Sequence, residues 1–138
     1  MKSLLPLVAG LTLASTIVFL LEALSIKLFP LPDSLDGENK EMVTGNVAQM
    51  PVMPLIFVLT AWSVGAFVGM VITRRFSGEG SKPLSSLVGL WVLLGANAEF
   101  YAMPHPAWFM IMANVVLIRI IFLAQDIKVG LPKDISSS

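Results

Sequence analysis

Four long apolar stretches dominate the pattern of hydrophobic and polar positions along the chain. They cover about residues 4–29, 51–73, 84–103 and 107–127, and charged positions inside them are few. A helix needs about 20 mostly apolar residues to cross the ~30 Å hydrocarbon core of a bilayer. The pattern therefore predicts an all-α, polytopic membrane protein with a single domain over residues 1–138, built as a four-transmembrane-helix bundle.

Prolines mark the ends of these stretches. Pro51 and Pro54 suit the first turn of the second predicted helix. Pro104 and Pro106 bracket His105, and this turn is so short that the third and fourth helices must be antiparallel neighbours. The first apolar run is longer than the ~7–15 apolar residues of a secretory signal, so we expect it to be a membrane helix.

The two longer connections differ in composition, and this difference predicts the orientation. Segment 30–50 is acidic, whereas segment 74–83 is rich in Gly and Ser and contains two arginines. Most cations fall on one side of the predicted membrane: Lys2, Arg74, Arg75, Lys82, Lys128 and Lys133. Short segments rich in Lys and Arg stay in the cytoplasm. We therefore expect both termini to be cytoplasmic and segment 30–50 to lie outside.

Overall composition agrees with a membrane protein and excludes several other classes. The chain is 56% hydrophobic and 13% charged, whereas soluble domains carry roughly 25% charged residues. Nine basic residues balance nine acidic ones, so the basic excess typical of nucleic-acid binding is missing. The chain has no cysteine and a single histidine, which argues against disulfides and zinc sites. We expect no cofactor, no metal and no nucleic-acid partner.

Ionisable residues within the apolar stretches are functional candidates by default. The main ones are Glu22, Glu99 and Arg119. At about 1.5 Å per residue, Glu99 lies roughly 6 Å, Glu22 roughly 10 Å and Arg119 roughly 18 Å from the outer boundary. Because Cα–Cβ bonds lean toward the helix N-terminus, Glu22 and Arg119 lean toward each other.

This geometry predicts a buried Glu22–Arg119 pair between the first and fourth helices, with Ser25 and Asn114 at compatible depths. Its simplest role is a structural clamp. One alternative is that Arg119 extends to the cytoplasmic face beside Asp126. Another is that the pair belongs to a transport or catalytic site.

A second polar group surrounds Glu99 near the outer end of the third helix. Gly95 and Ala96 share the face of Glu99, so we expect a close helix approach that buries the carboxylate. Other polar and aromatic residues at this margin are Asn97, Tyr101, His105 and Trp108. The group is interpreted either as a cation or metal site, for which the ligands are few, or as an aromatic anchor at the membrane interface, which is favoured.

Small residues at four-residue spacing, Ala61, Gly65 and Gly69, predict a packing face on the second helix. The pattern leaves open whether the partner is another helix of the same chain, a second copy or a different subunit. The eight methionines are more typical of adaptable packing than of copper ligands.

Three features of the chain carry a resemblance to a known group of proteins. They are Glu22 followed by Pro30 and Pro32, the segment WSVGAFVGMVITRR, and the turn MPHPAWF. In these features the chain resembles an uncharacterised family of small four-helix bacterial inner-membrane proteins. The resemblance implies a four-helix topology and a bacterial inner-membrane location, and it implies no activity.

From these patterns we expect a non-enzymatic membrane protein that works by assembly in the lipid bilayer, as a homo-oligomer or as an accessory subunit of a larger membrane complex. A bundle of four helices has little interior for a solute path, which favours assembly. The alternative is a transporter or channel for a small ion or solute. Its candidate lining residues are Glu22, Asn97, Glu99, Asn114 and Arg119.

Overall fold

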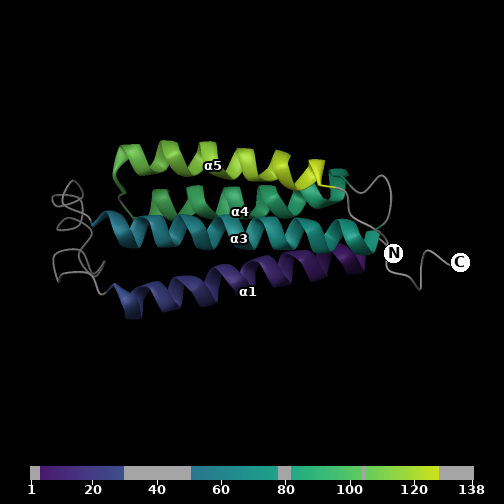
Figure 1. Cartoon of the computed structure of the whole chain (residues 1–138), viewed down its shortest axis with the longest axis horizontal. Coiled ribbons are helices and arrows are strands. Elements are labelled where there is room, and N and C mark those ends of the chain that lie inside the picture. The colour runs from purple at the N-terminus through teal and green to yellow at the C-terminus, as the bar shows by residue number, and fades with distance from the viewer. Residues whose placement is uncertain (1–3, 30–50, 78–81, 104, 128–138) are drawn as a thin grey trace, which may run out of the picture.

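The computed structural model describes residues 4–29, 51–77, 82–103 and 105–127, and these residues form four helices. The helices are α1 (Leu4–Leu28), α3 (Val52–Ser77), α4 (Lys82–Ala102) and α5 (Ala107–Asp126) (Figure 1). Each is long and apolar enough to cross a membrane. The predicted all-α four-helix architecture is confirmed, and α3 continues past its predicted end at residue 73 to Ser77.

The helices run along one common direction, and successive helices are antiparallel (Figure 1). At one end of the bundle α1 and α4 finish and α3 and α5 begin. We call it the aromatic end because the rings of Phe100, His105 and Phe109 pack together there. At the opposite end, called the Arg74 end, α1 and α4 begin and α3 and α5 finish. The centre of the bundle is α3, which packs against α1, α4 and α5. By contrast, α1 and α5 make no extensive contact with each other.

Small residues bring α1 and α3 together. A Cβ atom built on Gly69 would lie 2.8 Å from the carbonyl oxygen of Gly10, and one built on Gly65 would lie 2.9 Å from that of Ala14. The side chain of Ala61 is fully buried. The packing face containing Ala61, Gly65 and Gly69 therefore has a helix of the same chain as its partner at both glycines.

A hydroxyl group adds a polar contact to this interface. The Oγ1 atom of Thr73 is buried and lies 3.2 Å from the carbonyl oxygen of Pro6 and 3.0 Å from that of Gly69. Close backbone approach through small residues, reinforced by a hydroxyl, is a common way of joining helices in an apolar medium. This contact fixes α1 against α3 near the Arg74 end.

Arg74 joins the end of α3 to the end of α5. Its guanidinium group donates hydrogen bonds to the carbonyl oxygens of Ala124 and Ile127, the latter at 2.7 Å. The last carbonyl groups of a helix have no partner within that helix, and a cation near them also interacts favourably with the helix dipole. Arg74 therefore supplies hydrogen-bond donors for two carbonyl groups at the C-terminus of α5.

Candidate functional site

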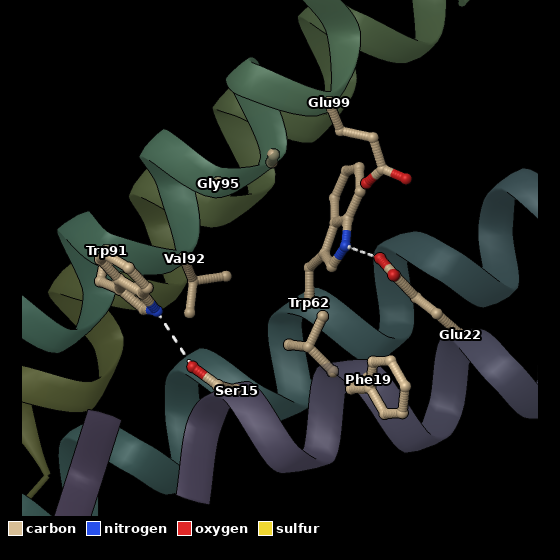
Figure 2. A pocket seen from close by; sticks show the side chains of 10 residues that line it. Ser15, Phe19, Glu22, Trp62, Trp91, Val92, Gly95 and Glu99 are labelled. Atoms are coloured by element: carbon tan, nitrogen blue, oxygen red, sulfur yellow. Dashed lines mark hydrogen bonds between the residues drawn. The ribbon is translucent and has the colours of Figure 1, made fainter. Parts of the chain in front are cut away.

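A cavity of about 260 Å³ lies between α1, α3 and α4 in the half of the bundle nearer the aromatic end (Figure 2). Its lining contains two carboxyl groups, three aromatic side chains and a glycine. These residues are Phe19, Glu22, Trp62, Trp91, Gly95 and Glu99. Although the bundle has only four described helices, it does contain space for a small ligand.

The cavity lies beside a polar contact between α1 and α4. This contact is a hydrogen bond from Trp91 Nε1 on α4 to Ser15 Oγ on α1, at 3.0 Å. Beyond it, the indole of Trp62 projects from α3 into the space between the other two helices (Figure 2). A Cβ atom built on Gly95 would meet no heavy atom within 4 Å. The expected close helix approach is therefore wrong at Gly95, which borders the open space of the cavity.

Glu22 is held by an aromatic N–H group. The Nε1 atom of Trp62 donates a hydrogen bond to Oε1 of Glu22. Trp62 is only 2% exposed, and its ring packs against Phe100 and Phe109 with centroid distances of 5.6 and 6.0 Å. The packing orients the indole, and the indole in turn orients the carboxyl group of Glu22.

Glu99 reaches the same part of the cavity from α4. Figure 2 shows the side chains of Glu99 and Glu22 converging beside the Trp62 ring from different helices. No lysine or arginine is among the described residues that line the cavity. Two carboxyl groups thus share one cavity without a cation from the described protein.

The structure does not form the predicted Glu22–Arg119 pair. Glu22 bonds to Trp62, and Arg119 lies exposed on α5. The helices α1 and α5 lie on opposite sides of α3 and α4 (Figure 1), so their matched depths do not bring these side chains together. The prediction was wrong about the direction around the helix axis, because Glu22 faces α3.

Two further polar candidates, Asn97 and Asn114, form a pair between α4 and α5. Asn97 Nδ2 donates to Asn114 Oδ1 at 2.9 Å, and Asn114 Nδ2 donates to Asn97 Oδ1 at 3.2 Å. Neither amide is among the residues that line the cavity. Tyr101 is 90% exposed and takes no part in either group. Of the five polar candidates, only Glu22 and Glu99 line the cavity.

His105 belongs to an aromatic cluster at the end of the bundle. Its ring stacks on Phe109 at a centroid distance of 5.7 Å and meets Phe100 edge-on at 5.1 Å. Nδ1 lies 2.9 Å from the carbonyl oxygen of Met103, and since a carbonyl only accepts, Nδ1 carries the proton. Burial lowers the pKa of His105 below its usual 6.5, and the hydrogen bond to Met103 opposes this shift.

Residue pattern alone did not single out Trp62, Trp91 and Phe19. The available signal was that Trp62 and Trp91 lie well inside apolar helices, where an indole N–H needs a hydrogen-bond partner. Ser15 and Glu22 supply those partners. The two indole N–H groups therefore form hydrogen bonds that join α1 to the other two walls of the cavity.

The lining chemistry suits the binding of a positive charge. Its carboxyl groups attract cations, and the π faces of its aromatic rings do so more weakly. No set of three or more His, Cys, Asp or Glu side chains suitable for a metal ion gathers within the described ranges. No family model, curated protein or solved structure matches the chain, so its function is argued from this geometry.

Proposed function

We propose that the protein is a multi-pass protein of the bacterial inner membrane that binds a small cationic solute in the Glu22–Glu99 cavity and conducts or transports it. The observation that carries this proposal is the convergence of two carboxyl groups from different helices in one cavity. Insertion scales give a free-energy cost of about 2.5–3.5 kcal/mol for a charged residue at the centre of a membrane helix. A bound cation offsets that cost, and no described lysine or arginine does so.

The proposed orientation places the cavity toward the outer face of the membrane. Arg74, Arg75 and Lys82 lie at the Arg74 end, whereas the cavity lies nearer the aromatic end. Basic residues favour the cytoplasmic side, so this distribution supports cytoplasmic ends for α1 and α5. In this orientation Glu22 and Glu99 lie on the outer side of the tight α1–α3–α4 contact at Val88, which is fully buried.

Reconstitution into liposomes tests this proposal. Uptake of small inorganic and organic cations is measured for the wild type, Glu22→Gln and Glu99→Gln. The matched control is Asp126→Asn, which neutralises an exposed carboxylate at the other end of the bundle. We expect uptake of at least one cation to fall about tenfold or more in both glutamine variants and to persist in the control. Uptake that is unchanged by both substitutions, or missing for every cation, contradicts the proposal.

Assembly is the second candidate function, and a different surface favours it. Asn97 is exposed on α4 and pairs with Asn114 of α5, so two amide groups lie on the outside of an otherwise apolar surface. Polar groups in an apolar medium favour contact with another protein. In this second proposal the chain self-associates, or joins a larger membrane complex, through the α4–α5 face.

Native mass in nanodiscs tests the assembly proposal. We expect the wild type to form oligomers or to keep a co-purifying subunit, and the double variant Asn97→Leu/Asn114→Leu to lose that association. The variant Thr60→Leu, which replaces an exposed polar residue on α3, is the control. A monomeric wild type without partners rules out assembly, and an unchanged double variant rules out this face.

A further inference from the structure

We propose that the ligand of the Glu22–Glu99 cavity is a small organic ammonium ion with an apolar body, and that Gly95 sets the size limit for that body. This inference rests on the proposed cation-binding function and names its ligand class and a specificity-determining residue. It is carried by the combination of carboxyl groups, aromatic walls and unfilled space in one cavity.

The oxygen ligands of the cavity fit an ammonium group better than a hard metal ion. Ca²⁺ takes six to eight oxygen ligands, and Mg²⁺ requires octahedral geometry. The side-chain oxygens of the described lining come from Glu22, Glu99 and Ser15, and the Ser15 hydroxyl already accepts a hydrogen bond from Trp91. Two carboxyl groups are enough to balance and hydrogen-bond a single ammonium group. The indole of Trp62 beside them adds cation–π attraction.

The rest of the lining fits an apolar body attached to that charge. Phe19 and Trp91 line the cavity, and neither ring is buried: Phe19 is 71% exposed and Trp91 is 56% exposed. Val18, Val92 and Ala96 add aliphatic surface. Aromatic side chains favour stacked or edge-on contacts with a second ring. A hydrated inorganic ion leaves these surfaces unused, whereas an aryl or alkyl ammonium ion covers them.

Gly95 keeps this space open. Gly10, Gly65, Gly69 and Gly89 all stand where an added Cβ would come within 3 Å of another atom, so tight packing explains each of them. Gly95 has no atom within 4 Å of such a Cβ, although glycine is less favourable than alanine inside a helix. Packing therefore does not explain the glycine, and a side chain at this position would project into the cavity.

The dimensions and the opening of the cavity narrow the ligand class further. Its volume of about 260 Å³ is below the ~300–1,000 Å³ of pockets for drug-sized molecules. Ser15, Phe19, Trp91 and Gly95 are exposed residues in the middle of their helices, so the cavity opens sideways between α1 and α4. The ligand is thus small and able to approach through the apolar phase. Both a free amine and the ethanolamine headgroup of a lipid carry this ammonium chemistry.

Tryptophan fluorescence gives a direct binding assay. The full-length chain with Trp108→Phe, in maltoside detergent, keeps Trp62 and Trp91 as reporters inside the cavity. The probe is phenethylamine, and 2-phenylethanol is its uncharged analogue of similar size. We expect saturable quenching by the amine, at least tenfold weaker binding of the alcohol, and at least tenfold weaker amine binding in Glu99→Gln. Equal binding of amine and alcohol, or no binding of the amine, overturns the inference.

The size limit is tested by filling the space at Gly95. Gly95→Leu adds bulk inside the cavity, and Ala98→Leu adds similar bulk to an exposed position on the same helix. We expect Gly95→Leu to weaken phenethylamine binding tenfold or more while Ala98→Leu leaves it within twofold. Gly95→Ala adds less bulk, so we expect it to weaken the binding of amines larger than phenethylamine more than the binding of phenethylamine itself. Unchanged binding in a folded Gly95→Leu variant contradicts a role for this position.

Two further measurements are needed. The first shows whether the ammonium group belongs to a lipid or to a free amine, and the second distinguishes failure of the ammonium inference from failure of the cation-binding proposal. Displacement of bound phenethylamine by phosphatidylethanolamine, but not by phosphatidylglycerol, identifies a lipid headgroup as the ligand. Displacement by neither lipid identifies a free amine. If Na⁺ or Ca²⁺ uptake depends on Glu22 and Glu99 while no amine binds, the ammonium inference fails and the cation-binding function stands. If neither amine nor inorganic cation responds to these residues, both fail.

Discussion

At the scale of single residues, Trp62 has the most consequences. Its ring lines the cavity between α1, α3 and α4, its N–H group binds Glu22, and its ring packs against Phe100 and Phe109. A buried carboxyl group that loses its hydrogen-bond donor bears the full cost of its desolvation. The indole N–H of Trp62 therefore affects both the stability of the bundle and the position of the Glu22 carboxyl group in the cavity.

Removing only the N–H group tests this dependence. Trp62→Phe keeps an aromatic ring and is expected to lower stability by about 1.5–3 kcal/mol, the usual range for hydrogen bonds to charged groups. The added effect of Glu22→Gln should be much smaller in this background than in the wild type, because the bond is already lost. Thermal unfolding in detergent gives all four values, with the more exposed Trp108→Phe as the control. Strictly additive losses contradict the contact.

His105 predicts a pH dependence of stability. Burial lowers its pKa below 6.5 in the folded protein, so the unfolded chain binds a proton more readily near that pH. Stability from this group is therefore fully present above pH 6.5 and declines as the pH falls below it. We expect the unfolding temperature to drop between pH 7.5 and 5.5 more steeply in the wild type than in His105→Gln. Parallel curves show that His105 does not titrate differently on folding.

At the scale of helices, the glycines have opposite roles. Gly69 lies where an added Cβ would be 2.8 Å from the backbone of α1, whereas Gly95 faces open space. Overpacking a tight interface costs typically 1–3 kcal/mol, and replacing an unrestrained helical glycine by alanine gains roughly 0.5–1 kcal/mol. Two glycines of the same protein are thus expected to respond in opposite directions to the same substitution.

This contrast is measured with Gly69→Ala and Gly95→Ala. We expect the first to lower the unfolding temperature in detergent and the second to raise it slightly. Gly89→Ala, whose Cβ would lie 2.6 Å from Ile121 Cγ1, should behave like Gly69→Ala, although the flexible Ile121 side chain can move. Stabilisation by Gly69→Ala, or clear destabilisation by Gly95→Ala, disproves the assignment of these positions.

Arg74 gives a second prediction for the helices. Arg74→Gln removes the cation at the C-terminus of α5 and is expected to cost about 1–2 kcal/mol. Hydrogen exchange should increase in the last turn of α5, near Ala124, and remain unchanged in α1. Arg75→Gln, at the exposed neighbouring position, is the control and should change stability by less than about 0.5 kcal/mol. Equal effects of both substitutions argue against a role for the Arg74 bonds.

The same helices show what can and cannot be predicted from the sequence. Length and apolar composition predict the four spans, because both are properties of each segment alone. The side of a helix that faces its neighbours is harder to predict when nearly all of its circumference is apolar. In α1, small residues and not larger apolar ones are buried. This uniformity is why Glu22 was predicted to face α5 and instead faces α3.

The candidate site was predicted only in part for a similar reason. Glu22 and Glu99 stand out as charges in apolar segments, and the structure places both in one cavity. Gly95 and Ala96 were expected to allow a close helix approach, but Gly95 faces open space. The indole that lines this part of the cavity belongs to Trp62, which comes from a third helix. The site depends on three helices meeting at one point, and no local pattern contains that information.

At the scale of the whole molecule, the bundle has a centre and two sides. Both α1 and α5 pack against α3, and α4 contacts all three other helices. The cavity lies on the α1 side and the paired asparagines lie on the α5 side. The cavity and the asparagine pair, which carry the two proposed functions, therefore belong to different sets of helices of one protein.

The Arg74 contact also has a consequence for biosynthesis. Its acceptors, Ala124 and Ile127, are at the end of the last described helix, whereas the α1–α3 glycine contact needs only the first half of the chain. During synthesis α1 and α3 can therefore join first, and α4 then completes the cavity. Arg74 has no acceptors until α5 has been made. Its bonds form last, so the last described helix closes a structure whose cavity is already in place.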